Sequence, residues 1–133
     1  MKPAVVVDAS ALSEAIVDGG ERGQAIEGML SDFGTWIAPH HVDLECTSSW
    51  LRMVRRGGLA PEDMTTAMAD LAVLPIERRA THWFAERIGE LIANLTPYDA
   101  AYVVLAETYH LPLLTADARL ARAPVPQCEF IVC

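Results

Sequence analysis

Four acidic residues follow predicted strands or open predicted helices, and their spacing suits metal chemistry. Asp8 follows the apolar run AVVV, Glu45 lies about one turn into a predicted helix, Asp99 follows a Thr-Pro pair, and Asp117 follows LPLLT. Each has a structural explanation when taken singly, since Asp117 can cap a helix and Asp99 can complete a T-x-x-D capping box. Four clustered carboxylates, however, repel one another unless a cation lies between them. Mg²⁺ and Mn²⁺ prefer oxygen ligands and serve phosphate chemistry, so the acids predict a cation site for that chemistry.

Short apolar runs alternate with helical patterns along the chain, and these elements must position the acids. We expect strands at 3–8, 35–39, 73–77, 111–115 and 128–133, and helices at 9–18, 21–34, 40–58, 61–72, 79–95 and 96–111. Ser10 and Thr96 are plausible N-caps, and Gly34 is expected to end the second helix. The proline within 73–77 favours a strand end or an edge strand.

This alternation predicts an α/β fold with helices on both faces of a mainly parallel sheet. We expect a single domain over residues 1–133, with three α/β/α layers and about five short strands. Ligands in such folds bind beyond the carboxyl ends of the strands. Asp8, Asp99 and Asp117 are therefore predicted to converge at that edge, with Glu45 close behind.

The acidic composition limits how the chain can bind nucleic acid. The formal net charge is −8 and Lys2 is the only lysine, so a broad basic face is excluded. A local patch remains, because Arg52, Arg55 and Arg56 share one side of a predicted helix. The patch can contact RNA, or it can be a solvated helix end.

Several further signals bear on location and on other kinds of site. No apolar run approaches the ~18 residues of a membrane span, and the start lacks a secretory signal, which predicts a cytoplasmic protein without a membrane partner. The cysteines lack CxxC spacing and are expected to stay reduced. The four histidines lack metal-ligand spacing, so no histidine metal site is expected. The tryptophans at 36, 50 and 83 are expected in the core or at an interface with a partner.

Four ordered motifs together resemble the PIN-domain ribonucleases, and more narrowly the VapC-type toxins of bacterial toxin–antitoxin modules. They are VVVDASAL with Asp8 and Ser10, APHHVDLECTSSWLRMVRRG with Glu45, LTPYDAAYVVLAE with Asp99, and LPLLTADARLA with Thr115 and Asp117. The resemblance spans essentially the whole chain in the family's order. One departure is Ser48, where many relatives have asparagine, and it leaves the hydrogen bonds around Glu45 open.

The resemblance implies a Mg²⁺- or Mn²⁺-dependent endoribonuclease that cleaves structured RNA, such as tRNA or rRNA, by attack of a metal-activated water. The acidic metal-site residues would be Asp8, Glu45, Asp99 and Asp117. Thr115 would orient the site, and Ser10 would do likewise unless it only caps its helix. Such toxins inhibit translation, are neutralised by a cognate VapB-type antitoxin, and form homodimers or toxin–antitoxin hetero-oligomers. Residues 25–33 and the helix around Trp50 would line the antitoxin groove or belong to the core.

Three other interpretations compete with this one. A receiver domain needs paired acids after the first strand and a late lysine, and an aspartate-nucleophile phosphatase needs an aspartate where Ser10 stands. The chain lacks both patterns. A catalytically silent PIN-like domain that only binds RNA or a protein stays open, although all four acids are present.

Overall fold

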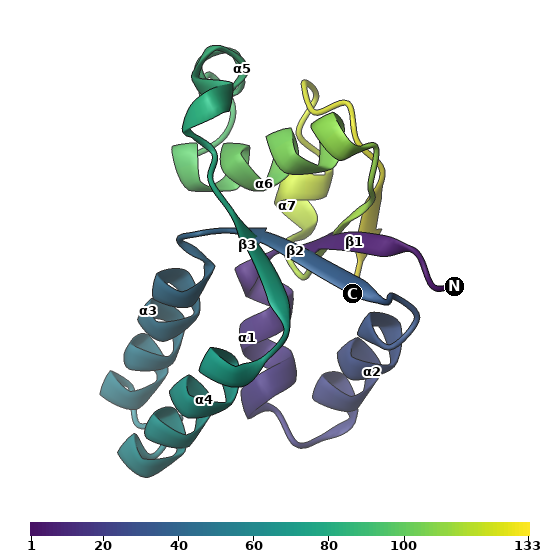
Figure 1. Ribbon diagram of the computed structural model, residues 1–133. Coiled ribbons are helices and arrows are strands. Elements are labelled where there is room, and N and C mark those ends of the chain that lie inside the picture. Colours follow the sequence, from purple (N-terminus) through teal and green to yellow (C-terminus); the bar gives the residue numbers. More distant parts are fainter.

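A five-stranded sheet divides the helices into two layers, as Figure 1 shows for the computed structural model, which describes all residues 1–133. The strands lie in the order β3-β2-β1-β4-β5 and every neighbouring pair is parallel. This confirms the predicted three-layer α/β fold. The strands are β1 (Ala4–Val7), β2 (Thr35–Pro39), β3 (Ile76–Arg79), β4 (Leu113–Thr115) and β5 (Phe130–Val132). The helices are α1 (Ala9–Val17), α2 (Glu21–Leu30), α3 (Val42–Arg55), α4 (Pro61–Val73), η1 (His82–Phe84), α5 (Ala85–Leu91), α6 (Pro97–Tyr109) and α7 (Ala118–Ala121).

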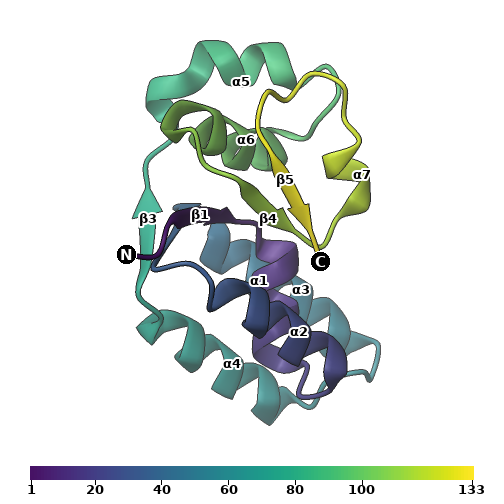
Figure 2. The ribbon, with the colours of Figure 1, turned by 90° about the vertical axis from the view of Figure 1, so that its right-hand side faces the viewer.

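The strand order determines which helices cover which face of the sheet. The chain runs from β1 outward to β2 and β3, and then returns to the other side of β1 for β4 and β5. Right-handed crossovers therefore place α1 to α4 on one face and α5 to α7 on the other. Figures 1 and 2 show these two layers. The direction of the crossovers reverses between β1 and β4, and the carboxyl ends of strands at such a point are the usual ligand site of α/β sheets.

The core is built around β1, which is covered on both faces. Val5, Val6 and Val7 are fully buried, as expected for a central strand of a parallel sheet. Trp50 of α3 is fully buried too, and its Nε1 donates to the Ser13 carbonyl oxygen at 3.1 Å, which joins α3 to α1. Trp50 is thus a core residue, which was one of the two alternatives that the sequence left open for this helix.

Two predicted helix ends are wrong. Ser10 does not cap α1, because the helix begins at Ala9 and Asp8 occupies the cap position. Helix α2 ends at Leu30, four residues before Gly34. Its last carbonyls find other donors, since Ser31 Oγ donates to the Gly28 oxygen at 2.7 Å and Trp36 Nε1 to the Leu30 oxygen at 3.1 Å. Local donors thus end the helix before the glycine is reached.

The second half of the chain follows the predictions more closely. β3 is an edge strand that begins directly after Pro75, as its sequence suggested. The helix predicted over 79–95 is shorter and consists of η1 and α5. Helix α6 begins as predicted, with Thr96 Oγ1 accepting from the Asp99 backbone N–H at 3.1 Å and Pro97 at the first position. No helix is long and apolar enough to cross a membrane.

Candidate active site

Asp8 lies at the carboxyl end of β1, where the strand turns directly into α1. Its backbone N–H donates to the Leu114 oxygen at 2.9 Å, which extends the β1–β4 ladder and fixes the residue beside β4. Only 4% of Asp8 is exposed. Burial is the main cause that raises the pKa of Asp8, and the Glu45 and Asp117 charges add to it, whereas hydrogen bonds from Ser10 and Thr115 act in the opposite direction.

Ser10 and Thr115 hold one oxygen of Asp8 from two sides. Ser10 Oγ and Thr115 Oγ1 each donate to Asp8 Oδ2 at 2.7 Å. Each hydroxyl also accepts a backbone N–H, Ser10 from Ala116 at 3.0 Å and Thr115 from Asp117 at 2.9 Å. Each hydroxyl thus gives its one proton to Asp8, so the 3.2 Å between the two hydroxyl oxygens is a contact without a hydrogen bond.

The second oxygen of Asp8, Oδ1, accepts no hydrogen bond from the protein. No side-chain oxygen in the chain is both sealed from solvent and without a partner. Oδ1 is therefore open to the cavity that Asp8 lines. The network leaves one oxygen fixed and the other available to a ligand.

Glu45 reaches the same cavity from α3, and two side chains hold it. The buried Tyr102 hydroxyl of α6 donates to Glu45 Oε1 at 2.7 Å, and His41 Nε2 lies 3.2 Å from the same oxygen. His41 is itself packed edge-on against Tyr98 and Tyr102, with ring centroids 5.5 and 5.4 Å away. Oε2 has no protein partner. Glu45, like Asp8, thus has one held oxygen and one free oxygen.

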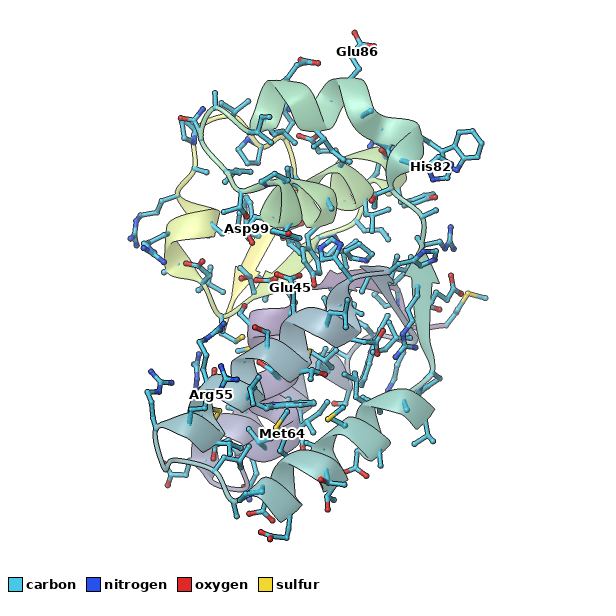
Figure 3. The ribbon with its side chains drawn as sticks, turned by 90° about the vertical axis from the view of Figure 1, so that its left-hand side faces the viewer. Glu45, Arg55, Met64, His82, Glu86 and Asp99 are labelled. Carbon is cyan, nitrogen blue, oxygen red and sulfur yellow. The ribbon has the colours of Figure 1, made fainter.

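Asp99 faces the cavity from the first turn of α6. Figure 3 shows Glu45 and Asp99 near each other between the two helical layers. Burial, followed by the charges of Asp8, Glu45 and Asp117, raises the pKa of Asp99 to about 6. Asp99 forms no ion pair with a basic side chain. The part of this shift that comes from Asp8, Glu45 and Asp117 is the repulsion among the acids that the sequence predicted.

Asp117 is the N-cap of α7, as predicted. Its Oδ1 accepts from the backbone N–H groups of Arg119 at 2.9 Å and Leu120 at 3.4 Å. It also lines the cavity with the other acids, so its role as a cap does not keep it away from them. Its capping bonds leave Oδ2 without a protein partner.

All four predicted acids line one cavity of about 190 Å³ at the carboxyl edge of the sheet, termed the acid cavity. Arg52 also lines it, whereas Arg55 and Arg56 do not. No three His, Cys, Asp or Glu side chains lie close enough together to form a direct ligand cluster. Mg²⁺ usually keeps several waters and is bound through one or two carboxylates. The four carboxylates, with free oxygens toward one small cavity, fit a hydrated ion of this kind.

The cysteine behind the site, Cys46, cannot act as a nucleophile at neutral pH. Cys46 is fully buried, and burial raises the pKa of its thiol to about 12, so the thiol stays protonated at neutral pH. All three cysteines are free, as predicted. The acids are therefore the groups at this edge that can act on a substrate through a bound cation.

Comparison with known proteins agrees with this geometry. The family model of the PIN domain matches residues 5–126. A VapC ribonuclease of Mycobacterium bovis is 37% identical over 96% of this chain and 97% of its own length. The chain belongs to the VapC family of PIN-domain proteins. Ribonuclease VapC1 of Mycobacterium tuberculosis is another relative, 36% identical over 94% of both chains.

Solved structures share the PIN fold at low sequence identity. The toxin VapC20 of Mycobacterium tuberculosis, described as cleaving the sarcin–ricin loop, superposes with a TM-score of 0.64 at 16% identity over 88% of this chain and 92% of its own. VapBC2 of Rickettsia felis, bound to a fragment of promoter DNA, superposes with a TM-score of 0.68 at 12% identity over 97% of this chain and 98% of its own.

Sequence reasoning missed some residues of this PIN domain that support the acids. Tyr102 had no assigned role, although its place one turn after Asp99 on the same helix was a usable signal. His41 was considered as a metal ligand and set aside, and its contact with the Glu45 carboxylate was not foreseen. Arg119, two residues after Asp117, was also not singled out.

Proposed function

We propose that this VapC-family protein is a Mg²⁺- or Mn²⁺-dependent endoribonuclease toxin. The observation that carries the proposal is the set of four carboxylates around one small cavity at the reversal point of a parallel sheet. The curated relatives are named ribonucleases. A structural neighbour that cleaves the sarcin–ricin loop supports structured RNA, either rRNA or tRNA, as the substrate class. Cleavage of such RNA would inhibit translation.

Each side chain has a specific task in this proposal. Asp8, Glu45, Asp99 and Asp117 hold the hydrated cation through their free oxygens. When bound, the ion supplies charge to the phosphate oxygens and lowers the pKa of a bound water. Ser10 and Thr115 keep Asp8 in one rotamer, and Tyr102 and His41 do the same for Glu45. Arg52, which lines the acid cavity, binds a phosphate of the RNA, and Arg55 and Arg56 extend this basic patch.

We further expect neutralisation by a cognate VapB-type antitoxin, in a homodimer or hetero-oligomer. A groove of about 320 Å³ between α1, α2 and α4 suits an apolar segment with basic residues, because Leu30 and Trp36 line it and Glu27 and Asp70 lie among them. VapBC2, a structural neighbour, is such a pair. Co-purification with the protein encoded beside this chain tests the partnership.

Cleavage of RNA by the purified protein tests the enzymatic proposal. Extracted total RNA is incubated with Mg²⁺ or Mn²⁺, with and without EDTA, and the cut ends are sequenced. Wild type should cleave only with the metal, and Asp8→Asn and Asp99→Asn should each lower the rate at least 100-fold, on the order of 3 kcal/mol. Glu86→Gln is the matched control, since this acid lies in the first turn of α5 and points away from the site (Figure 3).

The chemistry of the ends distinguishes the mechanism. Attack by water leaves no 2′,3′-cyclic phosphate, whereas attack by the ribose 2′-hydroxyl leaves one. Cyclic ends, or cleavage that survives EDTA, would exclude the metal-activated water. RNA that stays intact with pure, folded protein and either metal would favour the silent PIN-like domain.

A further inference from the structure

The cations of this acidic protein fall into two groups, one engaged and one free. Among the ten Lys and Arg residues, five donate to carboxylates or carbonyl oxygens within the fold. The other five are exposed and have no carboxylate oxygen closer than the 3.8 Å between Arg119 and Asp117. The engaged residues are Lys2, Arg22, Arg78, Arg79 and Arg87. The free ones are Arg52, Arg55, Arg56, Arg119 and Arg122, of which Arg52 donates at 3.2 Å to an uncharged group, the Ser48 hydroxyl.

The free arginines form two clusters on opposite faces of the sheet. Arg52, Arg55 and Arg56, the α3 arginines, lie at the end of a helix of the first layer. Arg119 and Arg122, the α7 arginines, lie on and directly after a helix of the second layer. The other basic residues are engaged elsewhere, so every free cation lies on or directly after α3, which carries Glu45, or α7, which Asp117 caps.

Hollows on the surface connect the two clusters through the acids. The acid cavity shares Glu45 and Arg52 with a neighbouring hollow of about 480 Å³. On its other side it shares Asp99 and Asp117 with a hollow of about 330 Å³ that Arg119 also lines. The three hollows thus form a continuous path, with arginine in each outer part and carboxylates in the middle.

We infer that an RNA strand crosses the acid cavity along this path, with the α3 arginines on phosphates at one side of the scissile bond and the α7 arginines on phosphates at the other. The inference rests on the proposed ribonuclease function. A chain of net charge −8 repels a polyanion, so phosphates must be held by local cations. Arg119 and Arg122 thus bind substrate. The two arginine clusters bind phosphates on either side of the scissile bond, and the phosphate between them lies at the metal site.

Salt-dependent binding tests the path without requiring cleavage. The probe is a fluorescein-labelled single-stranded RNA of mixed sequence, titrated in EDTA over a range of NaCl concentrations. Each single-strand phosphate contact contributes ~0.7 to the slope of log K against log [salt], so Arg119→Ala/Arg122→Ala should lower that slope by about 1.4. Arg52→Ala/Arg55→Ala should do the same. Arg22→Ala/Arg79→Ala removes two engaged arginines and should leave the slope unchanged.

Truncated substrates test whether the contacts lie on opposite sides. On a short RNA that carries the mapped cleavage site, trimming one end should abolish the effect of the α7 substitutions on kcat/KM, and trimming the other end should abolish that of the α3 substitutions. Loss of both effects on trimming the same end would overturn the two-sided path.

The outcomes separate this inference from the proposed function. A wild type that cleaves RNA, with an α7 variant of unchanged salt slope and kcat/KM, would overturn the path and leave the ribonuclease intact. Arginine-dependent binding with no cleavage under any metal would overturn the ribonuclease. An α7 variant that binds RNA normally but loses a co-expressed protein partner would assign these arginines to that partner, against the path.

Discussion

The ionisation of Asp99 links the acid cavity to the stability of the folded protein. Its pKa is raised to about 6, first by burial and then by the charges of Asp8, Glu45 and Asp117. Between roughly pH 4 and pH 6 the folded state therefore binds more protons at this position than the unfolded state does. The free energy of unfolding falls as pH rises through that window. At neutral pH, without metal, the site destabilises the fold that carries it.

Asp99→Asn should accordingly stabilise the metal-free protein at pH 7. The expected gain in the free energy of unfolding is on the order of 1 kcal/mol after allowance for solvent screening, and it should vanish near pH 4, where the wild-type carboxyl is also neutral. Urea denaturation in EDTA at pH 4 to 7 measures it. Asp32→Asn, an exposed acid just after α2, is the control. A variant less stable than wild type at pH 7 contradicts the prediction.

At the scale of elements, the site depends on a contact between helices of opposite layers. Tyr102 of α6 donates its hydroxyl proton to Glu45 of α3, past the carboxyl edge of the sheet. Both residues lie on helices that the sequence predicted well. Periodicity reveals helices but not the angle at which two of them meet, so this bond could not be predicted.

Tyr102→Phe should lower cleavage about tenfold while the fold persists. The change removes the donor to Glu45 Oε1, a hydrogen bond to a charged group that contributes ~1.5–3 kcal/mol, and leaves His41 as the remaining partner. Single-turnover rates and Mg²⁺ titration measure the loss. Tyr109→Phe, which removes a hydroxyl bonded to Arg79 at the far end of α6, is the matched control. Equal rates for the two variants would rule out a positioning role for Tyr102.

The parts of the fold that could be read from sequence share a physical cause. Strands such as β2 and helix starts such as Thr96–Pro97 are set by local composition and capping, and both were predicted at the residues where they occur. The end of α2 was missed because Trp36, six residues after Leu30, supplies a donor from beyond the helix. The acids were foreseen because each follows a strand or opens a helix. Ser10 and Thr115 were named beside them through the resemblance, whereas Tyr102, which lies 57 residues from Glu45 along the chain, was not.

At the scale of the whole molecule, excess negative charge and the acid cavity act on stability in different ways. A net charge of −8 makes the folded chain repel itself, and any salt screens that repulsion. A cation site makes a second contribution to the free energy of unfolding, because an ion that binds only the folded state stabilises that state by mass action.

MgCl₂ should therefore raise the melting temperature more than NaCl at the same ionic strength. At a Mg²⁺ concentration tenfold above its Kd, the added stability is about 1.4 kcal/mol. Asp8→Asn/Asp99→Asn should lose this difference, whereas Glu62→Gln/Asp63→Asn, with the same change of charge at the start of α4, should keep it. Thermal unfolding of the three proteins in both salts measures it. If Asp8→Asn/Asp99→Asn still melts at a higher temperature in MgCl₂ than in NaCl, the ion binds elsewhere.

The distance along the chain between Asp8 and its partners affects when the site is assembled. Thr115, which holds Asp8 Oδ2, lies 107 residues further on, and the Ser10 hydroxyl takes the Ala116 N–H from 106 residues away. During synthesis the first strand and helix leave the ribosome long before β4 exists to pair with β1. A growing chain that has not yet reached residue 115 thus has Asp8 but neither Thr115 nor Asp117. Its acid cavity stays incomplete while its own message is being translated.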